Sequence, residues 1–136
     1  FVLPPDQALE GARVTVKNGK TFGTVSVVSI DGKPLEESGR LLVMHLTDAL
    51  PTGMRFAHQD RRLLEARGRS PHLAEAGIVE IGLRLDVSGA WRAWVVDATG
   101  KRQREATLVR QGDAWVLSAR TVTDNGTCFA YEIVVE

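Results

Sequence analysis

Three tryptophans are the residues of this sequence best suited to bind a ligand. Trp91, Trp94 and Trp115 carry flat aromatic faces, and the apolar C–H faces of sugars stack on such rings when the rings are exposed. Trp91 and Trp94 are three residues apart, so a regular strand points them to opposite faces, and Trp115 could join only one of them. Trp91 and Trp94 are therefore candidate carbohydrate-binding residues. The alternative, which the usual burial of tryptophan favours, is that all three fill the core.

Carboxylates in the sequence show no arrangement suited to glycosidase chemistry, which needs two facing each other across a sugar. Glu36 and Glu37 are adjacent in a polar segment and point different ways, and Asp31 precedes Gly32 in a predicted turn, where aspartate is common. The sequence also contains no Gly-x-Ser-x-Gly elbow and no glycine-rich phosphate loop. We therefore predict no catalytic residue and no enzyme activity for this chain by itself.

Histidine and cysteine residues lack the spacing of metal ligands. His45, His58 and His72 are far apart in the sequence, and Cys128 is the only cysteine, so neither a Cys-x-x-Cys pair nor an internal disulfide is possible. The acidic segment at 124–126 is too short to supply the oxygens that calcium takes, and it is predicted to be a turn. We predict no metal and no cofactor.

Composition excludes several classes of partner. The 136 residues include 17 basic and 17 acidic side chains, and the hydrophobic and charged fractions of 43% and 25% are those of a globular domain. Zero net charge lacks the positive footprint of a nucleic-acid binder. No apolar run reaches the roughly 18 residues that span a membrane. We therefore expect no nucleic acid and no membrane as partners. Because the chain starts with Phe1 and shows no signal-peptide pattern, we expect a processed chain or a piece of a longer one.

Short apolar stretches separated by turn residues dominate the chain. Within 78–86, four apolar residues (Val79, Ile81, Leu83, Leu85) alternate with Glu80, Gly82, Arg84 and Asp86. Residues 41–46 have apolar residues on both faces, which predicts a central strand covered on both sides. Asn18-Gly19 predicts a tight hairpin, and the change of phase at 26–28 predicts a bulge or burial on both faces. Strands are predicted at 13–17, 20–30, 41–46, 54–56, 59–65 (which could also be a short helix), 78–86, 91–97, 104–109, 115–120 and 129–135.

This spacing, with no long helical period, predicts an all-β fold. We expect an antiparallel β-sandwich of about 8–10 strands, forming a single domain over residues 1–136. Its predicted core includes Leu42, Met44, Val79, Ile81, Leu83, Ile133 and Val135.

One segment resembles a known family. Val28 to Val43 reads Val-Ser-Ile-Asp-Gly-Lys-Pro-Leu-Glu-Glu-Ser-Gly-Arg-Leu-Leu-Val, which is similar to a recurring segment in the C-terminal β-sandwich domains of large bacterial glycoside hydrolases. Further matches are Thr52-Gly53-Met54 and the closing Tyr131-Glu132-Ile133. The sequence departs from the pattern at Ile30, where leucine is usual, and at Gly39, between the serine and the arginine.

The resemblance implies a non-catalytic accessory domain that packs beside the (β/α)₈ catalytic barrel of the same parent chain. It also implies an extracellular or periplasmic location in a bacterium. Two alternatives remain: a carbohydrate-binding module that uses exposed tryptophan, and an independent enzyme. Two coplanar exposed indoles would favour the binding module, whereas the enzyme would need carboxylates or histidines clustered in a cleft.

Overall fold

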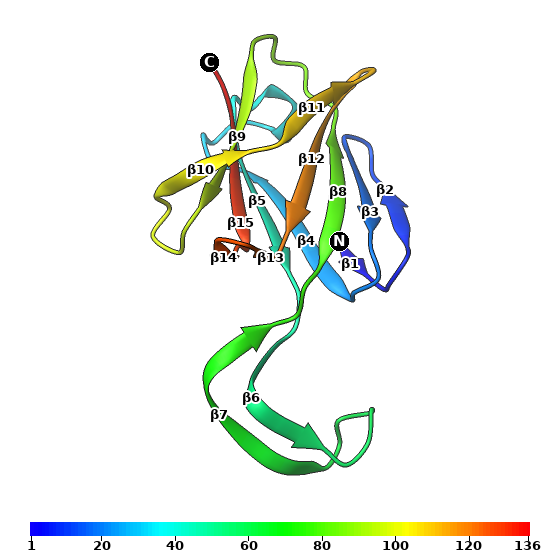
Figure 1. Ribbon diagram of the computed structural model, residues 1–136. Coiled ribbons are helices and arrows are strands. Elements are labelled where there is room, and N and C mark those ends of the chain that lie inside the picture. Colours follow the sequence, from blue (N-terminus) through cyan, green and yellow to red (C-terminus); the bar gives the residue numbers. More distant parts are fainter.

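Two antiparallel β-sheets pack face to face in the computed structural model, which describes residues 1–136, and a long hairpin extends from one end of them (Figure 1). The predicted antiparallel β-sandwich is confirmed. No helix in the structure is long and apolar enough to cross a membrane. The six-stranded sheet has the order β1 (Val2–Leu3), β4 (Gly23–Ser29), β5 (Arg40–Leu46), β15 (Ala130–Val135), β9 (Trp91–Val96), β10 (Arg102–Ala106). The five-stranded sheet has the order β11 (Leu108–Gln111), β12 (Ala114–Arg120), β8 (Ile78–Leu83), β3 (Val14–Asn18), β2 (Ala8–Glu10).

The core lies between the two sheets and is built by alternating residues of their central strands. The alternation predicted for 78–86 is confirmed over β8, where Val79, Ile81 and Leu83 are fully buried. Ile133 of β15 meets them from the opposite sheet and is also fully buried. Val135, another predicted core residue, is only partly buried and packs at the margin of the core.

Strand β5 is central, but only one of its faces is covered. Leu41 and Val43 point into the core and are fully buried, whereas Leu42 and Met44 point outward and are only half-buried. The prediction that Leu42 and Met44 belong to the core is therefore wrong. A strand with apolar residues on both faces does not reveal which face meets the second sheet, and no further layer covers the outer face of the six-stranded sheet.

Asn18-Gly19 does not form the predicted hairpin, because β3 and β4 belong to different sheets. The chain crosses from one sheet to the other here. The Asn18 side-chain amide donates hydrogen bonds to the carbonyl oxygens of Leu3 (3.1 Å), Pro4 (2.9 Å) and Thr21 (2.8 Å). These contacts with a distant segment stabilise a connection that the local turn preference did not predict.

Two further strand predictions also need correction. The bulge at 26–28 is absent, because β4 pairs with β5 in unbroken register from Thr24 to Ser29. Val28 instead points outward and is exposed. The predicted strand 104–109 divides at Thr107: β10 pairs with β9 in one sheet, and β11 pairs with β12 in the other. The chain again changes sheets at a point that strand propensity does not mark.

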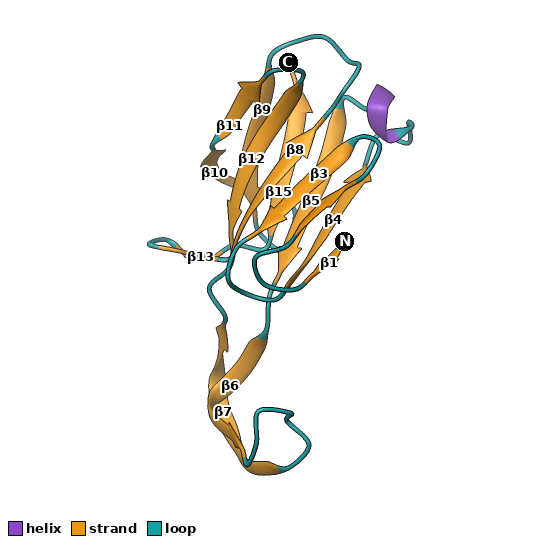
Figure 2. Cartoon of the chain, turned by 90° about the vertical axis from the view of Figure 1, so that its right-hand side faces the viewer, coloured by secondary structure: helices purple, strands orange, loops and turns teal.

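The hairpin of β6 (Ala49–Phe56) and β7 (Leu64–Ala74), here called the arm (residues 49–74), leaves the sandwich at the end opposite the carboxyl terminus (Figure 2). The predicted strand at 54–56 is confirmed as part of the longer β6, whereas the predicted strand at 59–65 is wrong for most of its length, because residues 57–63 form the tip loop of the arm and β7 begins at Leu64. The alternative of a short helix there is not observed either. Gly68 allows the two strands to approach closely, because it has φ +71° and a Cβ there would lie 2.7 Å from the Met54 nitrogen. Three short elements complete the fold: η1 (Leu35–Glu37), β13 (Val122–Thr123) and β14 (Gly126–Thr127).

Candidate functional site

The tryptophans do not form an exposed pair. Trp91 points into the core, is 5% exposed, and donates its indole N–H to the Val87 carbonyl oxygen at 3.1 Å. Trp94 lies on the opposite face of β9, half-buried, with the Arg102 guanidinium 5.4 Å from its ring centre. Trp115 packs against the core from the other sheet. Two coplanar exposed indoles are thus absent, and carbohydrate binding by Trp91 or Trp94 stays a prediction.

Asp31 holds together the turn in the segment that carries the family resemblance. Ser29 Oγ and Ser38 Oγ each donate a hydrogen bond of 2.8 Å to Asp31 Oδ1, and the Gly39 N–H donates one of 2.9 Å to Oδ2. The bond from Ser38, with those from Ser29 and the backbone, holds the pKa of the Asp31 carboxyl below its usual range. Because the carboxylate is engaged by its own turn, it acts as a structural acceptor here.

Glu132 is buried on the outer face of the six-stranded sheet. Its place between Tyr131 and Ile133, which point into the core, would ordinarily expose its side chain to solvent. Arg40 reaches over it from the neighbouring β5, and Arg102 reaches it from β10, two strands away, and each forms an ion pair with one of its carboxylate oxygens. The Arg102 hydrogen bond, reinforced by Arg40, lowers the pKa of Glu132. This cluster stabilises the sheet face and leaves neither carboxylate oxygen of Glu132 without a partner.

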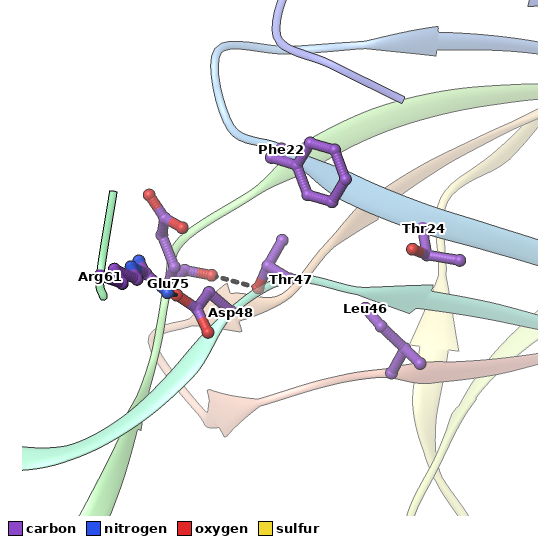
Figure 3. Close-up of a pocket in the computed structure, with 7 residues that line it drawn as sticks. All are labelled: Phe22, Thr24, Leu46, Thr47, Asp48, Arg61 and Glu75. Carbon is purple, nitrogen blue, oxygen red and sulfur yellow. Dashed lines mark hydrogen bonds and ion pairs between the residues drawn. The ribbon is translucent and has the colours of Figure 1, made fainter. Parts of the chain in front are cut away.

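A cavity lies where the arm joins the sandwich, and we call it the junction cavity (Figure 3). Its volume is about 490 Å³. Its lining comes from segments far apart in the sequence: the start of β4, the end of β5 and the residues that follow it, the tip loop of the arm, and the connection from β7 to β8. The lining residues are Phe22, Thr24, Leu46, Thr47, Asp48, Arg61 and Glu75.

The polar groups of the junction cavity fall into paired and unpaired sets. Asp48 forms an ion pair with Arg61, which the tip loop brings back to the base of the arm, and also accepts the Ala49 N–H at 2.9 Å. Thr47 Oγ1 donates to the Glu75 carbonyl oxygen at 2.6 Å and so joins the two strands at the base. The Glu75 carboxylate has no hydrogen-bond or ion-pair partner, and Glu75 is one of the residues that line the cavity.

His45 lies buried close to the junction cavity. It is fully buried, and neither ring nitrogen has a hydrogen-bond partner. Two glycines pack closely against its ring, and a Cβ at Gly23 or at Gly77 would lie 3.3 Å from its Nε2. The absence of a side chain at these positions therefore makes room for the imidazole. Burial lowers the pKa of His45 to about 4, because a charged imidazolium would lose its hydration there. His58 and His72 lie exposed on the arm, and no group of three or more histidine, cysteine or acidic side chains is arranged to hold a metal ion.

The sequence analysis did not identify the junction cavity. Phe22 is the most exposed aromatic residue of the chain, at 54%. The one feature of the sequence that could have indicated the cavity is this aromatic residue between Thr21 and Gly23 in a polar segment. Asp48 and Glu75 are 27 residues apart, so no short spacing in the sequence pairs them. Asp48 and Glu75 approach because the whole arm lies between them.

Comparison with protein-family models, with curated proteins and with solved structures finds no match for this chain.

Proposed function

We propose that this chain is a non-catalytic accessory domain of a glycoside hydrolase, with a packing role beside the catalytic barrel of the same parent chain. The resemblance of Val28–Val43 to such domains supports the proposal. In the structure this segment forms a continuous unit, in which the end of β4 leads through the turn of Asp31 and the η1 helix into β5. The matched residues therefore build two neighbouring strands of one sheet.

The arm is the observation that carries the packing role. Its strands pair only with each other, and an isolated two-stranded hairpin is marginally stable in water. Leu63 and Leu73 are 60% and 59% exposed along it. A ribbon that extends away from its own domain and exposes large apolar side chains is typical of a surface that contacts another folded unit.

The outer face of the six-stranded sheet supports the same role. Val28, Leu42, Met44 and Leu46 form an apolar row on this face, over β4 and β5. Solvent-facing positions of an antiparallel sheet are ordinarily polar. A neighbouring domain would remove this row from water, so the sheet face is a second candidate contact surface.

The charge of the arm indicates the chemistry of the surface it would meet. Residues 49–74 contain five arginines and two acidic residues, giving a net charge of +3, and the rest of the neutral chain therefore carries −3. Complementary charge favours correct association and repels surfaces of like charge. We expect the contacting face of the catalytic domain to be acidic around an apolar centre.

Hydrogen exchange of the arm should depend on the catalytic domain. In the isolated chain, the amides of residues 49–74 are expected to exchange far faster than those of β8, because the arm has few buried contacts. When the chain is joined to its catalytic domain, docking should slow exchange in the arm by about tenfold or more. Exchange followed by mass spectrometry of peptides from both forms measures this difference.

A glycine variant tests whether the shape of the arm matters. Gly68→Val places a Cβ within 3 Å of the Thr52 and Met54 backbone and should abolish the protection while leaving the melting temperature of the sandwich unchanged. Gly53→Asn is the matched control, because Gly53 also has positive φ but nothing lies within 4 Å of its Cβ position, and asparagine tolerates that conformation. Equal exchange of the arm with and without the catalytic domain would contradict the docking role.

The isolated chain is expected to hydrolyse no glycoside. Both classes of glycosidase need two carboxyl groups about 5–10 Å apart and free to act, but Asp31 and Glu132 are engaged in structural contacts and Asp48 is paired with Arg61. The measurement is an assay of the purified chain against a panel of aryl glycosides and polysaccharides. Turnover that disappears on replacing one aspartate or glutamate would overturn the accessory role.

A further inference from the structure

The junction cavity combines an apolar wall with several polar groups, of which the Glu75 carboxylate and the Thr24 hydroxyl have no partner in the protein. Phe22 is 54% exposed and Leu46 is 46% exposed, although both belong to a domain with a well-filled core. Figure 3 shows the Phe22 ring on one side of the cavity and the side chains of Asp48, Arg61 and Glu75 on the other. The space between them lies at the end of the sandwich from which the arm extends.

The hydrogen-bonding groups around this space are mixed in kind. The Glu75 carboxylate and the Thr24 hydroxyl have no protein partner and line the cavity. Arg61 is paired through Nη1 with Asp48, which leaves its other N–H groups as donors, since a guanidinium carries five. The site thus offers carboxylate oxygens as strong acceptors, the Thr24 hydroxyl as both donor and acceptor, and the remaining N–H groups of Arg61 as donors. These groups lie opposite the aromatic face of Phe22.

These features select a ligand class by exclusion. A free anion would meet two carboxylates, and the one cation is already paired with Asp48. A wholly apolar ligand would bury Glu75 without a partner, which is costly. A ligand with one apolar face and several hydroxyl groups satisfies both walls, because its C–H face covers an aromatic ring while its hydroxyls donate to carboxylates. The volume of about 490 Å³ lies within the range of ligand sites.

We propose that the junction cavity binds a neutral sugar ring, stacked on Phe22 and hydrogen-bonded to Glu75, with Asp48 and Arg61 as an oriented pair beside it. This site is separate from the tryptophans of β9, and the inference does not rest on the accessory role. The cavity is open and few groups are directed at the ligand, so the dissociation constant is expected to be on the order of 1 mM.

The test is a titration of the purified ¹⁵N-labelled chain, followed by NMR, with neutral hexoses and pentoses and their β-linked disaccharides. Saturating shifts are expected for residues 21–25, 46–48 and 75–77. Phe22→Ala should weaken binding by about tenfold or more, and Glu75→Gln by a smaller factor, because the amide still accepts one hydrogen bond. Phe1→Ala is the matched control: Phe1 is an exposed aromatic outside the cavity, and its replacement should leave the affinity unchanged.

Three results would overturn the proposal. The first is the absence of any saturable shift up to about 100 mM sugar, a hundredfold above the expected dissociation constant. The second is binding that survives Phe22→Ala but disappears in Trp94→Ala, which would place the sugar on β9 instead. The third is tighter binding of glucuronate or glucosamine than of the neutral sugars, which would change the ligand class. None of these results bears on the docking of the arm. Phe22 is a surface residue, so an unchanged melting temperature should show that the variant is folded.

Discussion

Replacing Leu83 with alanine is expected to lower the free energy of unfolding by about 2–5 kcal/mol. Leu83 is fully buried and ends β8, where it pairs across the sheet with Val14 on one side and Trp115 on the other. Removing its branched end loses the transfer energy of the buried methyl groups and leaves a cavity that two packed sheets cannot close. Denaturant unfolding, followed by tryptophan fluorescence or circular dichroism, measures the loss.

Leu42→Ala is the matched control for this prediction. Leu42 occupies a central strand but points away from the core and is half-buried, so its truncation should cost about 1 kcal/mol or less in the isolated chain. A loss below about half a kcal/mol for Leu83→Ala, or equal losses for the two variants, would mean that the buried face of the sandwich is assigned wrongly.

Acid should destabilise the protein through His45 before the carboxylates contribute. The pKa of His45 falls from 6.5 to about 4 on folding, so the unfolded chain binds more protons between these values. The free energy of unfolding is therefore highest above about pH 6.5, where His45 is neutral in both states, and it decreases progressively as the pH falls toward 4. At about 1.4 kcal/mol per pH unit, the loss reaches at most about 3 kcal/mol. Denaturant unfolding at a series of pH values measures it.

A variant without the titrating group isolates this effect. In His45→Leu, the free energy of unfolding should change much less between pH 6.5 and 4.5. Asp31 and Glu132, whose pKa values are lowered on folding, should reduce the stability of both proteins only at lower pH. In the wild type, the imidazole NMR signals should show His45 remaining neutral until the pH nears 4, a measurement that does not depend on the variant. Protonation of His45 near pH 6.5 in the folded chain would contradict the prediction.

The sequence by itself determined where most strands lie and which residues share a face. Side chains alternate across a strand, so Val79, Ile81 and Leu83 had to share one surface, and the structure buries all three. Turn residues placed most strand ends within a few positions. These are local properties of a few consecutive residues, which is why an antiparallel sandwich could be predicted without knowledge of any distant contact.

The tertiary structure alone decided which sheet each strand enters and which face of an apolar strand is covered. The residue types of 41–46 do not identify the buried face, because both faces carry apolar side chains and the one polar side chain, His45, lies on the face that is buried. Only the packing of the second sheet buries Leu41 and leaves Leu42 half-exposed. At Asn18-Gly19 the local preference for a hairpin was overridden by contacts that include two hydrogen bonds from Asn18 to the amino-terminal segment. Contacts of this kind depend on the whole chain.

The junction cavity was also decided by the tertiary structure. Its aromatic wall comes from residue 22, its acids from residues 48 and 75, and its cation from residue 61, at the tip of the arm. No short spacing joins these positions. They meet because β4 and β5 are neighbours in the sheet and because the arm begins and ends at the same point, bringing Asp48 and Glu75 together across its base. The strands themselves can be predicted from the alternation of apolar and polar residues. Side chains that come together only because distant strands pair show no such periodicity in the sequence.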